Sequence, residues 1–341
     1  MPTNKSPGMD GLTMEFYRTF WDILGPDLAT VWAESLQGGV LPLSCRRAVL
    51  AFLPKKGDLL DLQNWHPVSL LSTDYKIVVK AISLRLGSVM ADVIHPDQTY
   101  TVPGCSIFDN LFLVRDLLEL GRREGLSFAL LSLDQEKVFD RVDHGYLLGT
   151  LQAFGFGPQF VSFLQVLYTS AECLVRLNWT LTEPVSFRRG VRQGCPLSDQ
   201  LYALAIEPFL CLLRRRLTEL VLWEPELGLV LSAYADDVLL VVQDPGDLAG
   251  HQRLTAELQH QEQGESLPPG CPEPGASSRS HAAALSRETI AQKLEGKSLA
   301  NKMCLDTLGE YVGQHWVLGE QTLLLSHLGA HEISSFILWA P

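Results

Sequence analysis

The chain has 341 residues, of which 46% are hydrophobic and 19% are charged. This composition is that of a globular protein with room for one large or two ordinary domains. The formal net charge of −12 excludes a protein that is basic overall, although a locally positive groove can still bind nucleic acid. The seven cysteines form no Cys-x-x-Cys pair, so neither a zinc site nor a disulfide framework is predicted.

No targeting or membrane-spanning segment is visible in the sequence. The N-terminus lacks the apolar core of a signal peptide, and no run of about 18 apolar residues occurs. We therefore expect an intracellular protein, in the nucleus or the cytoplasm, that is neither secreted nor membrane-bound.

The N-terminal third contains several predicted helices. Residues 4–11 form a turn cluster, and an amphipathic helix follows over residues 13–32, with an expected break near Gly25 and Pro26. Two further helices are predicted over residues 74–93 and 109–124, because their apolar positions recur at helical spacing.

A strand over residues 48–54 ends at Lys55, Lys56 and Gly57. Two lysines and a glycine at a flexible tip suit the binding of a phosphate. A solvated hairpin end is equally compatible with this pattern, so the sequence leaves both interpretations open.

A near-continuous apolar strand over residues 127–134 ends on a carboxylate, Asp134. Such a strand is buried on both faces, so we expect Asp134 at the edge of a core and facing out of it. A polar turn that contains Phe139 follows. The elements predicted next are helices at residues 144–154, 158–168 and 198–216, strands at residues 172–178 and 183–188, and a glycine-punctuated loop at residues 189–197.

Residues 229–242 predict a β-hairpin with an acidic tip, because two apolar runs flank a turn that contains Asp236 and Asp237. Adjacent carboxylates beside apolar strands are costly unless a cation neutralises them, and hard oxygen ligands suit Mg²⁺. A solvated acidic turn is the simpler alternative, because Asp is a favoured turn residue.

Two-metal phosphoryl transfer needs carboxylates from separate elements that converge on ions about 3.5–4 Å apart. Asp134 at a strand end and the Asp236–Asp237 pair at a hairpin tip are candidates, because the ends of adjacent strands can share a metal. Spacing alone does not show that they meet. After residue 247 the composition changes: residues 251–290 are polar and are expected to be disordered.

The order of the motifs resembles the reverse transcriptase domain of LINE-type (non-LTR) retrotransposons over residues 4–247. The matching stretches are residues 5–11 (KSPGMDG), 53–57 (LPKKG), 64–71 (NWHPVSLL), 133–140 (LDQEKVFD), 192–198 (RQGCPLS) and 234–237 (YADD).

The resemblance implies an α+β, right-hand polymerase fold with fingers and an antiparallel palm sheet packed by helices. Fingers and the start of the palm are expected in residues 1–125, and the palm with the catalytic motifs in residues 126–247. Residues 248–290 are expected to form a disordered linker and residues 291–341 a tail of unknown structure. The family's thumb is missing or not recognisable.

Carried over residue by residue, the resemblance implies that Asp134, Asp236 and Asp237 are the catalytic carboxylates and bind Mg²⁺, or Mn²⁺ in its place. The residues implied to bind substrate are Lys55 at the triphosphate, Phe139 beneath the sugar, Gln193 and Gly194 beside the nucleotide and template, and Tyr234 in the YADD motif. Phe139 can instead be a core ring under the sheet. Gln193 and Gly194 can simply form a loop that leads into a helix.

The sequence also departs from the family pattern. His66 stands where an arginine usually clamps the triphosphate, and neutral imidazole cannot supply a bidentate fork. Cys105 replaces a common arginine, Val138 a usual alanine and Asp199 a frequent proline.

Three hypotheses follow from these observations. The first is an RNA-directed DNA polymerase that uses an RNA template, a DNA primer and dNTPs. The second is a catalytically inactive, retrotransposon-derived relic that binds nucleic acid weakly or not at all; the missing thumb, His66, Cys105 and the acidic charge favour it. The third is an adaptor role for the C-terminal tail, for which the sequence offers no motif.

Overall fold

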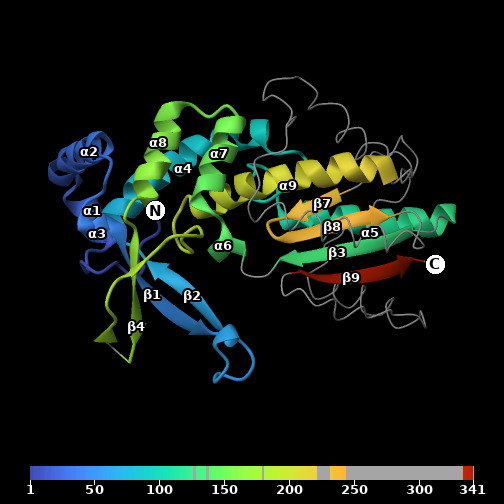
Figure 1. Cartoon of the computed structure of the whole chain (residues 1–341), viewed down its shortest axis with the longest axis horizontal. Coiled ribbons are helices and arrows are strands. Elements are labelled where there is room, and N and C mark those ends of the chain that lie inside the picture. Colours follow the sequence, from blue (N-terminus) through green and yellow to red (C-terminus); the bar gives the residue numbers. More distant parts are fainter. Residues whose placement is uncertain (126–127, 136–137, 179, 221–230, 243–332, 341) are drawn as a thin grey trace.

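The computed structural model describes residues 1–340 except 126–127, 136–137, 179, 221–230 and 243–332. Two β-sheets form the framework of the described part, and helices pack around them (Figure 1). One sheet has the strand order β2-β1-β4-β5, with β6 also paired to β4, and the other has the order β7-β8-β3-β9.

The first sheet is built on an antiparallel hairpin of β1 (Arg47–Pro54) and β2 (Trp65–Leu70). β1 also runs parallel to β4 (Glu172–Leu177), a pairing between segments far apart in the sequence. The short strands β5 (Thr180–Leu181) and β6 (Val185–Ser186) pair with β4.

The second sheet is antiparallel throughout. Its central strands are β3 (Phe128–Gln135) and β8 (Asp237–Val242), with β7 (Leu231–Tyr234) beside β8 and β9 (Ile333–Ala340) beside β3. Leu130 and Leu131 point to opposite faces of β3, and both are buried, which confirms the prediction of a strand covered on both sides. The acidic hairpin is confirmed as well, whereas β9 was not predicted.

Nine helices of the described part surround the sheets. They are α1 (Met14–Thr19), α2 (Trp21–Gly38), α3 (Leu43–Arg46), α4 (Thr73–Val93), α5 (Ile107–Glu124), α6 (Val138–Arg141), α7 (His144–Ala153), α8 (Pro158–Tyr168) and α9 (Ser198–Leu220). A 3-10 turn, η1 (Leu62–Asn64), precedes β2. None of the helices in the described ranges combines the length and apolar character required to cross a bilayer.

Local chemistry explains where several of these helices begin and end. Ser106 and Asp109 form a capping box at the start of α5, and Gly125 ends that helix in the left-handed conformation. Asp143 caps α7 by accepting a hydrogen bond from the backbone N–H of Tyr146 at 3.0 Å. Pro158 occupies the first turn of α8, where its missing N–H costs nothing.

Four sequence-based expectations need correction. The expected break near Gly25 and Pro26 lies instead at Phe20, and Pro26 sits inside α2. Pro26 is the sixth residue of that helix, so α2 lacks the backbone hydrogen bond from residue 26 to residue 22 and nevertheless continues through this position. The polar turn after β3 contains the one-turn helix α6, the strand expected over residues 183–188 is reduced to β6, and the helix expected to end at residue 216 continues to residue 220.

The expected disorder of residues 251–290 lies outside the described residues. The helix expected to end at residue 32 continues to Gly38, and the remaining predicted helices and strands agree with the structure to within about two residues at their ends.

A tight contact between α5 and β3 fixes the sheet to its covering helix. A Cβ atom added at Gly121 would lie 2.4 Å from Cε1 of Phe128, a buried ring on β3. We predict that Gly121→Ala lowers the free energy of unfolding by about 1–3 kcal/mol, because the core cannot accept the extra methyl group without shifting.

Gly38→Ala is the matched control, since a Cβ there meets nothing within 4 Å. This variant should be neutral or stabilising by up to about 1 kcal/mol through its helix propensity. Urea unfolding followed by circular dichroism measures both. Equal stability of the two variants would contradict the packing argument.

Candidate active site

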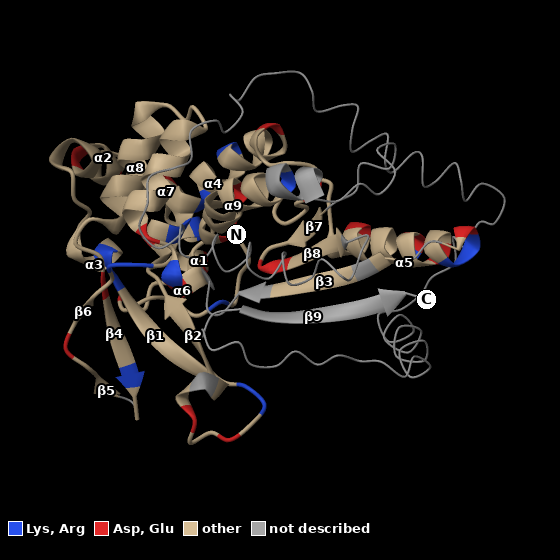
Figure 2. Ribbon diagram, turned by 45° about the vertical axis from the view of Figure 1, so that its right-hand side comes forward, with Lys and Arg blue, Asp and Glu red and all other residues tan. Residues whose placement is uncertain are grey.

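The acidic turn joins β7 to β8 through Ala235 and Asp236, and Tyr234 pairs with Asp237 across it. Ala235 has a φ of +56°, the left-handed region that favours glycine. Asp236 is half-buried and Asp237 is exposed. The turn therefore presents two consecutive acidic residues, red in Figure 2, at the tip of a hairpin whose strands are buried at Leu231, Ala233, Val238, Leu240 and Val241.

The register of β3 against β8 decides where Asp134 lies. Leu133 pairs with Val238, the residue after Asp237. Asp134 is the next residue along β3, so its backbone lies at the same end of the sheet as the acidic turn. Facing residues of an antiparallel pair are about 4.5–5.5 Å apart at their Cα atoms. The strand pairing thus brings together backbone positions that are a hundred residues apart in sequence.

The side chain of Asp134 is outside the described part of the structure. Among the described side chains, no group of three or more His, Cys, Asp or Glu residues is arranged to hold a metal. Two of the three predicted ligands, Asp236 and Asp237, are described. Their carboxylate oxygens are the donor type that Mg²⁺ prefers, and the position of Asp134 on β3 is compatible with a third ligand.

Tyr234, the last residue of β7 before the turn, contacts Tyr100. Their rings make an edge-to-face contact with centroids 5.1 Å apart. Burial raises the pKa of the Tyr100 hydroxyl well above its usual range, and the nearby carboxylates of Asp199 and Asp236 raise it further. Tyr100 thus stays a neutral hydrogen-bond donor between two acidic residues.

The glycine-punctuated loop packs against the segment that follows β3. The backbone N–H groups of Gly190 and Val191 donate to the carbonyls of Val142 and Phe139, both at 2.7 Å. A Cβ at Gly190 would lie 2.8 Å from the carbonyl oxygen of Phe139, and its φ is +88°. Close backbone approach and a left-handed conformation therefore both require glycine at this position.

Gln193 and Gly194 connect this loop to both neighbouring elements. The carbonyl of Gln193 accepts from the N–H of Ser69 on β2 at 2.9 Å, and its side chain donates to Asp140 at 3.2 Å. Gly194 has a φ of +101°, and a Cβ there would lie 3.0 Å from the Ser69 carbonyl. The loop thus links the first sheet to α6.

Phe139 is half-buried and stacks on Tyr202 of α9, with ring centroids 4.5 Å apart. One face of the ring is therefore covered by the core. The position is compatible with the core interpretation on that face and with a substrate contact elsewhere on the ring.

Lys55 is exposed at the end of β1, where its N–H donates to the carbonyl of Asn64 at 2.7 Å. The loop that starts with Lys55 forms the tip of the β1–β2 hairpin and carries blue, cationic ribbon in Figure 2. His66 pairs with Leu53 on the same hairpin. The predicted triphosphate-binding residue thus belongs to the first sheet, whereas the three aspartates belong to the second.

The sequence interpretation missed the role of Arg192 in the core. Its side chain is 2% exposed, donates to the carbonyl of Arg46 at 2.8 Å, and lies over the rings of Tyr75 and Phe187 at 5.5 and 5.7 Å. This buried cation anchors the glycine loop to the core. Its place directly before Gln193 and Gly194 is the only hint that the sequence gives.

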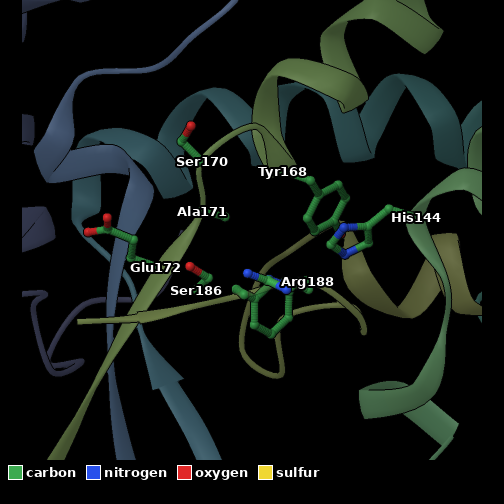
Figure 3. A pocket seen from close by; sticks show the side chains of 8 residues that line it. His144, Tyr168, Ser170, Ala171, Glu172, Ser186 and Arg188 are labelled. Carbon is green, nitrogen blue, oxygen red and sulfur yellow. The ribbon is translucent and has the colours of Figure 1, made fainter. Parts of the chain in front are cut away.

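A pocket of about 400 Å³ adjoins the glycine loop (Figure 3). Its lining includes His144, Tyr168, Ser170, Phe187 and Arg188. The imidazole of His144 stacks on Tyr168 at 4.3 Å, and its Nε2 lies 2.9 Å from the carbonyl oxygen of Gly190. A carbonyl only accepts, so Nε2 carries the hydrogen.

Comparison with known families gives a match over residues 53–264 to the family described as "Reverse transcriptase (RNA-dependent DNA polymerase)". The chain is 72% identical over 248 residues to "Transposon TX1 uncharacterized 149 kDa protein" of Xenopus laevis, covering 73% of this chain and 19% of that protein. It is 26% identical over 251 residues to "Retrovirus-related Pol polyprotein from type-1 retrotransposable element R2" of Popillia japonica, covering 69% of this chain and 32% of that protein.

The chain therefore spans less than a third of the length of these relatives. Among solved structures, apo telomerase from Candida tropicalis truncated from its C-terminal domain aligns with a TM-score of 0.46 and 13% identity, over 69% of this chain and 52% of that one.

The environment of His144 predicts a pH-dependent stability. Burial lowers the pKa of its imidazole, and Arg192 lowers it further, while the Gly190 carbonyl and Asp143 raise it without reversing the net shift. A histidine with a lowered pKa in the folded state binds its proton more tightly when unfolded, so its contribution to stability is lost as the pH falls below about 6.5.

We therefore expect the free energy of unfolding to fall more steeply between pH 7.5 and 5 in the wild type than in His144→Phe. The variant keeps an aromatic ring against Tyr168 but has no group to titrate. Urea unfolding at several pH values measures the two slopes. Equal pH dependence of the free energy of unfolding in the two proteins would contradict a lowered pKa of His144.

Proposed function

The chain belongs to the reverse transcriptase family, and we propose that it is an RNA-directed DNA polymerase that adds deoxynucleotides to a primer 3′-hydroxyl. The observation that carries the proposal is the β3–β8 register. It supports a cluster of Asp134, Asp236 and Asp237 at one end of a sheet. The domain itself is of the type found in LINE-type, non-LTR retrotransposons.

The aspartates would hold divalent cations, with Mg²⁺ preferred and Mn²⁺ a substitute. When bound there, such cations lower the pKa of an attacking hydroxyl and offset charge on the leaving oxygen. The reaction joins the primer 3′-oxygen to the α-phosphorus of a dNTP and releases pyrophosphate. In this assignment the reacting phosphate binds at the end of the sheet where Asp236 is half-buried and Asp237 is exposed.

The two sheets correspond, in this proposal, to the fingers and the palm of a right-hand polymerase. We assign the fingers to the sheet of β1, β2 and β4, and the palm to the sheet of β3, β7, β8 and β9. Lys55 on the fingers hairpin then reaches the triphosphate as a mobile charge. The glycine loop with Gln193 and Gly194 connects the first sheet to α6, since it bonds to Ser69 on β2 and to Asp140 on α6.

Nucleic acid is the partner implied by this activity, and the net charge of −12 requires locally placed cations. Arg188 and Arg189 follow the aromatic ring of Phe187, next to the stacked rings of Tyr168 and His144. Arginines beside aromatic faces suit single-stranded nucleic acid, because bases stack while phosphates are neutralised. We assign this surface to the RNA template.

A primer-extension assay on an RNA template with Mg²⁺ and dNTPs tests the activity. We expect extension by the wild-type chain and a loss of at least about 100-fold in Asp236→Asn, because each removed carboxylate contributes several kcal/mol to stabilisation of the transition state. Asp22→Asn on the exposed surface of α2 is the matched control and should extend like the wild type.

Equal extension by Asp236→Asn and the wild type would end the catalytic assignment. Salt-dependent RNA binding without any extension would support the inactive relic instead.

The template surface gives a separate prediction. Arg188→Ala should weaken binding of single-stranded RNA and reduce the slope of log affinity against log salt by about 0.7, the value for one lost phosphate contact. Fluorescence anisotropy across a salt series measures this slope. Arg122→Ala, an exposed arginine on α5 that pairs with Glu119, is the control and should leave the slope unchanged. An unchanged slope in Arg188→Ala would remove this surface from the template path.

A further inference from the structure

The acidic turn is strained immediately before its first carboxylate. Ala235 has a φ of +56°, a left-handed conformation that is unfavourable for a residue with a Cβ. A conformation of this kind persists only where the surroundings hold it. The contacts that hold Ala235 therefore determine where Asp236 lies.

The side-chain amide of Gln98 makes those contacts. Its Oε1 accepts from the backbone N–H of Ala235 at 3.3 Å, and its Nε2 donates to the Ala235 carbonyl at 3.4 Å. The same Oε1 accepts from the N–H of Tyr100 at 3.0 Å. Gln98 is 1% exposed, so these bonds form away from solvent. A carboxamide suits this position because it donates and accepts in one plane.

The backbone around Gln98 is paired with β7. The N–H of Ala233 donates to the carbonyl of Asp97 at 2.8 Å, and the N–H of Thr99 donates to the carbonyl of Ala233 at 3.1 Å. Asn110 on α5 adds a bond to the Ala233 carbonyl at 3.0 Å and another to the hydroxyl of Ser232 at 2.8 Å. The segment that carries Gln98 thus lies along the strand that leads into the turn.

A buried ion cluster ties the same segment to α9. Arg214 donates to both carboxylate oxygens of Asp97 at 2.6 and 2.7 Å and to Glu207 at 2.8 Å. Burial alone raises the pKa of Asp97, but its bonds from His95 and Arg214 lower it overall, so it remains charged. Removing one partner from such a cluster is strongly destabilising. The ion cluster therefore fixes the segment that carries Gln98 to α9.

We propose that Gln98 is a positioning residue that holds the Asp236 turn through the Ala235 backbone and thereby sets the geometry of the metal-binding carboxylates. It acts through Ala235 and does not itself contact substrate. The catalytic consequence rests on the proposed polymerase function, whereas the hold on the turn does not. Residues that do not bind the metal but orient its ligands typically contribute about 10–100-fold to metal affinity or activity.

The test compares Gln98→Met with Gln200→Met in the full chain. Gln200 is a second buried glutamine that donates to one backbone carbonyl, that of Ser83 at 3.1 Å, on the contact between α9 and α4. Both variants keep side-chain length and remove a buried amide. Gln98→Glu is the conservative companion, because it keeps the acceptor for the Ala235 N–H and loses the donor.

The first readout is hydrogen exchange of the Ala235 amide, which needs no catalysis. We expect exchange to accelerate about fivefold or more in Gln98→Met, an intermediate rate in Gln98→Glu, and the wild-type rate in Gln200→Met. Unchanged protection in Gln98→Met would overturn the proposal. If that variant fails to fold, Gln98→Glu decides by the same criterion against the wild type.

The second readout is Mn²⁺ binding followed by electron paramagnetic resonance. We expect about tenfold weaker binding in Gln98→Met and wild-type affinity in Gln200→Met. Faster exchange with unchanged Mn²⁺ affinity would overturn the link between Gln98 and the carboxylates. Failure of the proposed function is distinguished by Asp236→Asn: if it binds Mn²⁺ like the wild type, the metal site is wrong, and the exchange result still decides the hold on the turn.

Discussion

The antiparallel pairing of β3 with β8 is the constraint on which the candidate active site depends. It places Leu133 opposite Val238, and so it places the backbones of Asp134 and Asp237 at the same end of one sheet. Side chains alternate between faces along a strand, so a slip of one residue would move every side chain of β3 to the other face. The close packing of the buried side chains of Leu130, Leu131 and Leu133 opposes such a slip, because each would have to fit among different neighbours on the other face.

Around this pairing, backbone conformations are held by close neighbours and not by the intrinsic preference of the residues. Gly190 and Gly194 occupy positions where a Cβ would lie within 3.0 Å of backbone carbonyls, so the loop can approach both α6 and β2. Ala235 adopts a conformation better suited to glycine and is fixed by the Gln98 amide. Strain of this kind gathers at sites whose geometry must be defined, and here it lies next to the predicted carboxylates.

Local patterns in the sequence were sufficient for most of the elements and for the family. The apolar runs of β3 and of the acidic hairpin, the apolar spacing of α4 and α5, and the motif order all predicted what the structure and the family match contain. Local sequence patterns did not predict which side chains contact one another. The stacking of Phe139 on Tyr202, the buried Arg192 and the bonds of Gln98 to Ala235 join residues that are distant in sequence, and propensity carries no information about such pairs. Pro26 misled the prediction because its position within a helix depends on where that helix begins.

The strand β9 shows why the sheet itself could not be predicted in full. All eight of its residues pair with β3, from Ile333 opposite Gln135 to Ala340 opposite Phe128, and it lies outside the family match that ends at residue 264. An apolar strand with an open edge offers its unpaired N–H and C=O groups to any other extended chain. In the described part of the chain, β8 covers one edge of β3 and β9 covers the other. The strand that contains Asp134 thus forms the ladder hydrogen bonds on one of its edges with residues 333–340. The sequence pattern of these residues did not indicate a strand partner.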